Sequence, residues 1–156
     1  MSQPDTRAVI LEPGGGERIT IGASTLSIKA ETATTGGTVF MSETELEAGF
    51  PGPPAHVHDR LHDMFYVLEG VLTFLVDGET IDAQPGTFVC VPPGTVHTFA
   101  NRSDGPVRFL NLNTPAGFEG YMRELGEAFS GRGAPPTPAE MGAIASRYDF
   151  RPAPAS

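Results

Sequence analysis

The stretch Gly86–Asn101 reads GTFVCVPPGTVHTFAN, and it carries most of the information about the fold. An apolar run, Phe88–Val91, is followed by Pro-Pro-Gly at 92–94 and by a second apolar segment that begins at His97. Proline and glycine are the residues that tight turns require, so this pattern predicts a strand, a turn and a returning strand. It places His97 at the start of a strand. Cys90 lies within the apolar run, where we expect a buried, structural thiol.

Similar short β-type segments, separated by turn signals, recur along most of the chain. They are Ala8–Leu11, Arg18–Ile21, Thr25–Ala30, Thr38–Glu45, His56–His58, Asp63–Leu68, Val71–Val76, Thr80–Ala83, Thr87–Val91, His97–Asn101 and Val107–Asn113. Asp77-Gly78 separates two of them and predicts a tight hairpin, which makes the pairing antiparallel. The 19 glycines and 15 prolines exclude a helix bundle, and a hydrophobic content of 39% excludes a disordered chain. An all-β sandwich or barrel remains.

The net charge of the chain limits the classes of molecule that we expect it to bind. The chain has 10 Lys and Arg against 19 Asp and Glu, a net charge of −9, so we expect no binding to nucleic acid or anionic membranes. The first residues hold no long apolar segment, which predicts neither a signal peptide nor a membrane span. A single cysteine allows no internal disulfide, and a reducing, cytoplasmic setting is therefore expected.

Three of the four histidines fall within seven residues, and two of them lie two positions apart. Residues i and i+2 of a strand face the same side, so His56 and His58 converge. Between His58 and Asp63 the chain is long enough for a turn, so Asp63 can lie on the neighbouring strand. Side chains alternate along that strand, which places Asp63 and Phe65 on one face and His62 on the other. If the first face is the inner one, a carboxylate joins the histidines beside apolar side chains. His97 can join them from a distant strand.

The character of the chain changes at Pro115. Between Ala116 and Phe129, apolar residues recur at helical spacing, and they are Phe118, Tyr121, Met122, Leu125 and Phe129. Thr137-Pro138-Ala139-Glu140 predicts a capped second helix that ends near Ser146. The first helix packs its apolar stripe against a sheet or closes a ligand cavity. We expect residues 151–156 to be a frayed end.

With these motifs in place, the chain resembles the cupin family in its small single-domain form. The second family motif, G-x5-P-x-G-x2-H-x3-N, is matched by Gly86, Pro92, Gly94, His97 and Asn101. The first, G-x5-H-x-H-x3–4-E-x6-G, is matched at His56, His58 and Gly70, with Asp63 where the family has glutamate and with its leading glycine out of register. The two motifs stand at the separation of compact bacterial members.

The resemblance implies one domain over 1–156: a cupin jelly-roll β-barrel over about 7–114 with a C-terminal α-helical extension over about 116–146. It also implies a site for one divalent transition metal, with Fe, Mn or Ni favoured and Zn possible. By position, the ligands are His56, His58, Asp63 and His97. Aspartate is shorter than glutamate, so three versions stay open: Asp63 is a ligand, Asp63 is an outer group or acid–base residue, or His62 replaces it. A metal-free pocket is the remaining alternative.

The residues expected to line a substrate pocket are His62, Phe65, Phe99, Phe40, Phe118 and Met122, although core packing explains the aromatic ones almost as well. The preferred function is a dioxygenase similar to quercetinase-type cupins, acting on a small aromatic or polyketide-like molecule, with Asp63 as ligand or general base. A non-oxidative isomerase or cyclase is the second hypothesis, and a non-enzymatic ligand-binding protein is the third. The resemblance further implies a homodimer.

Overall fold

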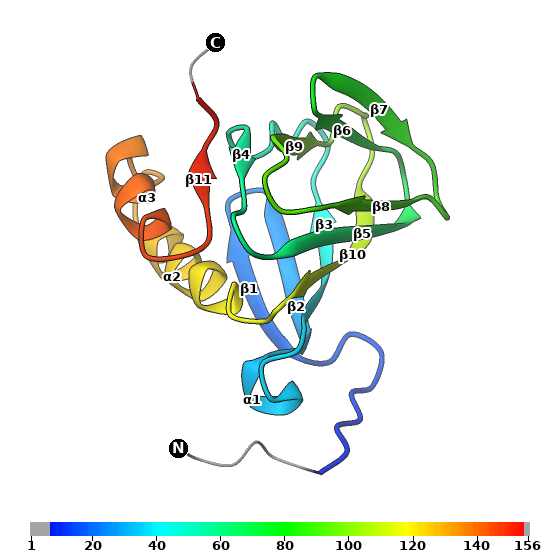
Figure 1. Ribbon diagram of the computed structural model, residues 1–156, viewed down its shortest axis with the longest axis vertical. Coiled ribbons are helices and arrows are strands. Elements are labelled where there is room, and N and C mark those ends of the chain that lie inside the picture. Colours follow the sequence, from blue (N-terminus) through cyan, green and yellow to red (C-terminus); the bar gives the residue numbers. More distant parts are fainter. Residues whose placement is uncertain (1–6, 155–156) are drawn as a thin grey trace.

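Two antiparallel sheets form the centre of the computed structural model, which describes residues 7–154 (Figure 1). The six-stranded sheet has the order β1 (Glu17–Ile21), β2 (Ser24–Ala30), β3 (Phe40–Leu46), β10 (Val107–Thr114), β5 (His62–Glu69) and β8 (Phe88–Val91). The five-stranded sheet has the order β11 (Arg151–Pro152), β4 (His56–Val57), β9 (His97–Ala100), β6 (Leu72–Val76) and β7 (Glu79–Ala83). The predicted mostly-β fold is therefore confirmed.

Alternation along the strands builds the core between the sheets. In β5 the side chains of Asp63, Phe65 and Val67 are buried, whereas His62 and Tyr66 are exposed. This is the predicted assignment of faces. The inward side chains form one apolar cluster, whose buried members are Leu46, Phe65, Val67, Leu72, Phe74, Ala83, Val91, Val107 and Phe109.

Helices α2 and α3 lie on one side of the sheets, apart from α1 (Figure 1). Helix α2 (Glu119–Phe129) packs against β1, and α3 (Pro138–Ala145) packs against α2. Phe118, Tyr121 and Leu125 are buried in a second apolar cluster together with β1, β2 and β3 side chains, so the stripe faces the core. A short helix, α1 (Thr32–Thr35), was not predicted. Within residues 7–154, no helix is long and apolar enough to cross a lipid bilayer.

Two local predictions are confirmed in detail. Asp77 and Gly78 both have positive φ, 50° and 84°, and they join β6 to β7 in the predicted hairpin. The Thr137 side chain accepts a hydrogen bond from the Glu140 backbone, the Glu140 side chain returns to the Thr137 backbone, and Pro138 follows the cap. Short-range turn and capping chemistry therefore decided these features.

Three predictions about the same chain are wrong. Ala8–Leu11 forms no strand, and Val9, Ile10 and Leu11 are exposed; among the described residues, the edge strand β1 pairs only with β2 and not with this segment. Cys90 is exposed, since β8 directs Val89 and Val91 inward and therefore Cys90 outward. Arg151 and Pro152 are not frayed, because they pair with β4 as β11; residues 155–156 lie outside the described part.

Two glycines of the predicted motif differ in their surroundings, which gives a matched test. Both have positive φ, 77° at Gly70 and 90° at Gly86. A Cβ on Gly70 would stand 2.5 Å from the Pro106 carbonyl oxygen, whereas one on Gly86 meets nothing within 4 Å. We expect Gly86→Ala to cost about 1–2 kcal/mol of unfolding free energy for the left-handed backbone, and Gly70→Ala to cost a further ~1–3 kcal/mol for the overlap. Urea unfolding of both variants measures this, and equal losses would contradict it.

Candidate metal centre

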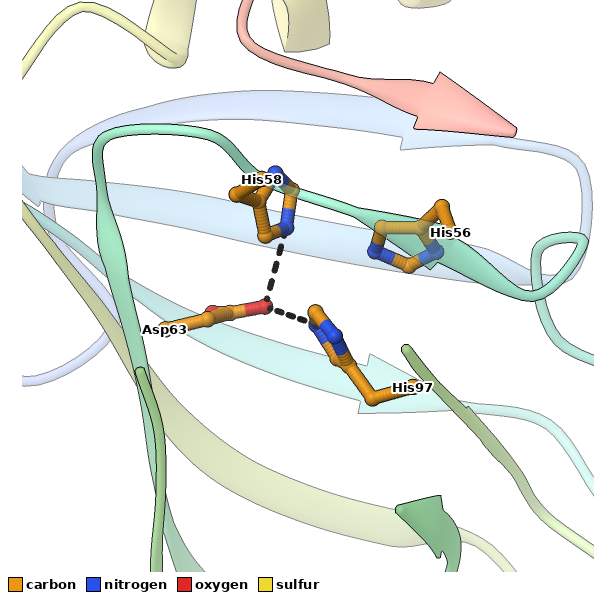
Figure 2. A group of neighbouring side chains, drawn as sticks. All are labelled: His56, His58, Asp63 and His97. Carbon is orange, nitrogen blue, oxygen red and sulfur yellow. Dashed lines mark hydrogen bonds and ion pairs between the residues drawn. The ribbon is translucent and has the colours of Figure 1, made fainter. Parts of the chain in front are cut away.

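Three strands and one loop, which come from both sheets, bring the four predicted ligands together. His56 belongs to β4, His58 follows it, Asp63 belongs to β5, and His97 begins β9. His56 and His97 are direct partners in the β4–β9 pair. One nitrogen or oxygen from each of the four side chains lies within 4.8 Å of the others, and all four are buried (Figure 2). The four residues, which are up to 41 positions apart in the sequence, thus form a compact cluster in the structure.

Backbone carbonyls orient the three imidazole rings. The Nδ1 atoms of His56, His58 and His97 lie 2.8, 2.6 and 3.0 Å from the carbonyl oxygens of Pro54, Asp149 and Thr95. A carbonyl oxygen only accepts, so each Nδ1 carries the proton and donates it. In the neutral rings the lone pair is therefore on Nε2. This is the usual way in which a protein prepares histidines as metal ligands.

The carboxylate of Asp63 is held from both sides. Its Oδ1 accepts hydrogen bonds from the Nδ2 atoms of Asn111 and Asn113, each at 2.8 Å. Its Oδ2 lies 3.0 Å from Nε2 of His97 and 3.4 Å from Nε2 of His58 (Figure 2). The amides therefore fix one oxygen and direct the other toward the imidazoles.

This donor set fits a divalent transition metal. Lone pairs point toward one another from Nε2 of neutral His58, from Nε2 of neutral His97 and from Oδ2 of Asp63. These lone pairs repel one another, so the arrangement is stable only with a cation or a proton between them. Three imidazole nitrogens and one carboxylate oxygen suit Mn, Fe, Co, Ni, Cu or Zn. The shorter side chain of aspartate reaches the histidines because β5 brings Asp63 to within hydrogen-bond distance of His97.

Electrostatics within the cluster agree with this picture. Burial lowers the pKa of His56 to about 4, and the neighbouring His97 contributes in the same direction. For Asp63, burial alone would raise the pKa, but hydrogen bonds and charge interactions with His58 and His97 hold it well below its usual range. Burial also opposes the charge on His58, yet Asp63 and Asp149 together outweigh it and raise the pKa of His58. Asp63 is therefore the anion of the cluster and His56 is a neutral base.

Aromatic side chains surround the histidines on the helix side. The Phe150 ring stacks on His56 with 4.4 Å between the ring centroids, and Phe118 meets His58 edge-on at 5.3 Å. Tyr121 stacks behind Phe150 at 5.4 Å. A cavity of about 470 Å³ adjoins this side, between residues 59–61, 115–118 and 146–149. The surroundings of the cluster are thus apolar, with a space next to them that can take a small molecule.

The residues expected to line a substrate pocket do not all lie together. Phe118 contacts His58, whereas Phe65 and Phe99 belong to the apolar cluster between the sheets. Phe40 is buried in the other apolar cluster, and Met122 packs against it. His62 is exposed on the face of β5 opposite to Asp63 and is not part of the four-residue group.

Four residues near the cluster were missed from the sequence: Asn111, Asn113, Asp149 and Phe150. The first two could have been found, because alternation along the predicted strand Val107–Asn113 places both on the face of Phe109. No short-range pattern identified Asp149 or Phe150. They reach the histidines only because the chain returns to β4 from about 90 residues away, as the contact between His58 and Asp149 shows.

Comparisons with known proteins agree with the fold. The family described as "Cupin domain" matches residues 42–113, which include all four candidate ligands. Quercetin 2,3-dioxygenase of Bacillus subtilis (strain 168) is 32% identical over 127 residues, which are 78% of this chain and 36% of that protein. The chain thus spans only about a third of that relative's length.

Two solved structures show the same fold at low identity. KdgF from Halomonas sp. has a TM-score of 0.63 at 17% identity, covering 72% of this chain and 98% of that one. The polyketide cyclase RemF from Streptomyces resistomycificus has a TM-score of 0.61 at 20% identity, covering 69% of this chain and 80% of that one. With its two antiparallel sheets and its matched domain, the chain has the cupin fold and carries a cupin domain over residues 42–113.

Proposed function

We propose that the protein is a metal-dependent enzyme that holds one divalent transition metal with His56, His58, Asp63 and His97. Fe, Mn or Ni is favoured and Zn is possible. We further propose that it is a dioxygenase for a small aromatic or polyketide-like molecule, like the quercetin 2,3-dioxygenase that it resembles. The observation that carries the proposal is the convergence of three oriented imidazoles and one amide-held carboxylate within 4.8 Å.

A metal bound there would supply Lewis acidity and a place for dioxygen to react, since four protein ligands leave two octahedral positions open. The chain's own residues supply the rest. The carbonyls of Pro54, Asp149 and Thr95 keep the three rings oriented. The aromatic side chains on the helix side exclude water, which strengthens every electrostatic interaction within the site.

Asp63 has one of two roles. In the first it is a ligand through Oδ2, which faces His58 and His97. In the second, three histidines hold the metal and Asp63 takes a proton from the substrate, as a carboxylate can when a substrate binds within its hydrogen-bond reach. Asp63→Asn separates them. Loss of bound metal identifies a ligand, whereas retained metal with lost turnover identifies a base.

A non-oxidative isomerase or cyclase is the second candidate. The observation in its favour is the Asp63–His97 pair, whose Oδ2 and Nε2 atoms are 3.0 Å apart and form a buried carboxylate–imidazole couple able to move a proton. The fold shared with a polyketide cyclase is compatible with this chemistry.

Oxygen consumption distinguishes the two candidates. The protein, loaded separately with Fe²⁺, Mn²⁺ and Ni²⁺, is mixed with a panel of flavonols, diketones and aromatic polyketides in an oxygen-electrode cell. We expect stoichiometric oxygen uptake with one class of these compounds. Product formed at the same rate without oxygen would overturn the dioxygenase and favour the isomerase or cyclase. Saturable binding without any product would leave a ligand-binding protein.

A further inference from the structure

The last described part of the chain, residues 148–153, runs alongside the strand that carries His56, and we call it the C-terminal strap (Figure 1). Arg151 pairs with Val57 and Pro152 pairs with His56 in the β11–β4 ladder. One position further, the Ala153 backbone N–H donates to the Ala55 carbonyl at 2.9 Å. The strap is thus an added antiparallel strand at the edge of the five-stranded sheet.

Asp149 ties the strap to two of the candidate ligands. Its carbonyl oxygen accepts the Nδ1–H of His58 at 2.6 Å. Its carboxylate accepts the backbone N–H groups of the three residues that follow His58, at 2.6, 3.0 and 2.9 Å, and these are Asp59, Arg60 and Leu61. One side chain and one carbonyl therefore hold both the His58 ring and the loop that leads to Asp63.

Phe150 covers the cluster. Its ring lies nearly parallel to that of His56, at an interplanar angle of 17°, and Tyr121 supports it from behind. With the strap in place, His56 and His58 are each only 3% exposed and His97 is 1% exposed. The three histidines are therefore almost inaccessible from outside while the strap is in place.

The strap is the covering element that is easiest to displace. Its ladder to β4 is two residues long and stands at the sheet edge. Its outer ion pair, between Arg151 and Asp59, joins two exposed side chains, and such pairs contribute little. Short ladders at a sheet edge, with few buried contacts, open at a low free energy in a folded protein. The 470 Å³ cavity lies against residues 146–149, so movement there would join it to the cluster.

We infer that the C-terminal strap is a gate over the metal centre, closed when Asp149 holds His58 and Phe150 covers His56, and opened by release of the strap from β4. Its purpose, the admission of substrate, rests on the proposed function. Its existence does not, because opening changes the accessibility of the histidines with or without metal. Asp149 is in this view a positioning residue, and Phe150 controls access.

A reversible lock tests the gate on the metal-free full-length protein. Ala55 and Ala153 face each other across the ladder, at the separation of about 5.5 Å between Cα atoms that a disulfide accommodates. The variant Ala55→Cys/Ala153→Cys also carries Cys90→Ser, because Cys90 is exposed and could mispair. Diethyl pyrocarbonate reacts with accessible imidazole, and mass spectrometry follows each histidine. The exposed His62 serves as the reference within the same molecule.

We expect the oxidised variant to react at least tenfold more slowly at His56, His58 and His97 than its own reduced form, with the rate at His62 unchanged. Equal rates in the two forms would overturn the gate. Phe150→Ala provides a second measurement that needs no disulfide, and it should speed the reaction at His56. Phe129→Ala is its matched control, because that ring packs on Gly22 at the far end of α2. Equal acceleration in both variants would also overturn the gate.

The same variants keep the gate and the proposed function apart. Suppose that the wild-type protein binds no Fe²⁺, Mn²⁺, Ni²⁺ or Zn²⁺, but the disulfide slows the reaction of the histidines with diethyl pyrocarbonate. The gate is then supported and the proposed metal-dependent function is wrong. If metal binds and the lock changes nothing, the gate fails and the metal enzyme stands.

Discussion

His97→Ala is expected to abolish metal binding. His97 is the most deeply buried of the four candidate ligands at 1% exposed, its Nδ1–H is held by the Thr95 carbonyl, and its Nε2 faces the Asp63 carboxylate. Alanine removes one of three nitrogen donors and leaves a space that no neighbouring donor is placed to fill. Because changes to the outer partners of a metal ligand already cost roughly 10–100-fold in affinity, loss of the ligand itself should cost more.

The measurement is metal content per chain after purification without chelator, followed by titration of the metal-free protein with Mn²⁺ and Ni²⁺. His62→Ala is the matched control, since it deletes the one exposed histidine and should keep full metal content. Wild-type metal content in His97→Ala would remove this residue from the site. A fall in both variants would point to a surface site instead.

Phe65→Ala is expected to cause the largest loss of stability, about 3–5 kcal/mol of unfolding free energy. The Phe65 side chain is completely buried between the sheets. Its ring contacts those of Phe74, Phe99 and Phe109, with centroids 4.9, 5.5 and 5.8 Å away. Truncation leaves a cavity within this close-packed group, and the rings around it belong to both sheets, so the gap cannot close without shifting strands.

Urea unfolding measures the effect, with Tyr66→Ala as the control on the same strand. Tyr66 points to the opposite face and is 41% exposed, so its loss should cost less than about 1 kcal/mol. Similar costs for the two variants would contradict the assignment of faces on β5. A small loss at Phe65 combined with weaker substrate binding would instead make this residue part of a pocket, as one interpretation of the sequence proposed.

Local patterns predicted the features that depend on neighbours in the chain. Period-two alternation placed Asp63 and Phe65 on the inner face of β5 and His62 on the outer face. The Asp77-Gly78 hairpin and the Thr137 cap follow from the chemistry of two to four consecutive residues. Asn101, the last residue of the second motif, donates from Nδ2 to the carbonyls of Leu46, Glu47 and Gly105.

The same patterns failed where a strand needs a partner. Ala8–Leu11 has the composition of a strand but pairs with neither sheet, because composition alone does not decide which segment hydrogen-bonds to a sheet edge. Arg151 and Pro152 have no strand signal, yet they pair with β4. Cys90 lies in an apolar run that suggests burial on both faces, but β8 is an edge strand with one face in solvent.

By itself, then, the sequence determined the class of fold and identified the candidate ligands, with His62 left as an alternative to Asp63. Turns and the alternation of side chains along a strand are properties of short segments. The two histidine motifs consist of such segments, so they could be read from the sequence. Only the tertiary structure decided how these side chains are held and covered. Asn111 and Asn113 fix Asp63 from β10, while Asp149 and Phe150 reach His58 and His56 from the C-terminal strap. Such contacts depend on which strands become neighbours, and that is set by the packing of the whole chain.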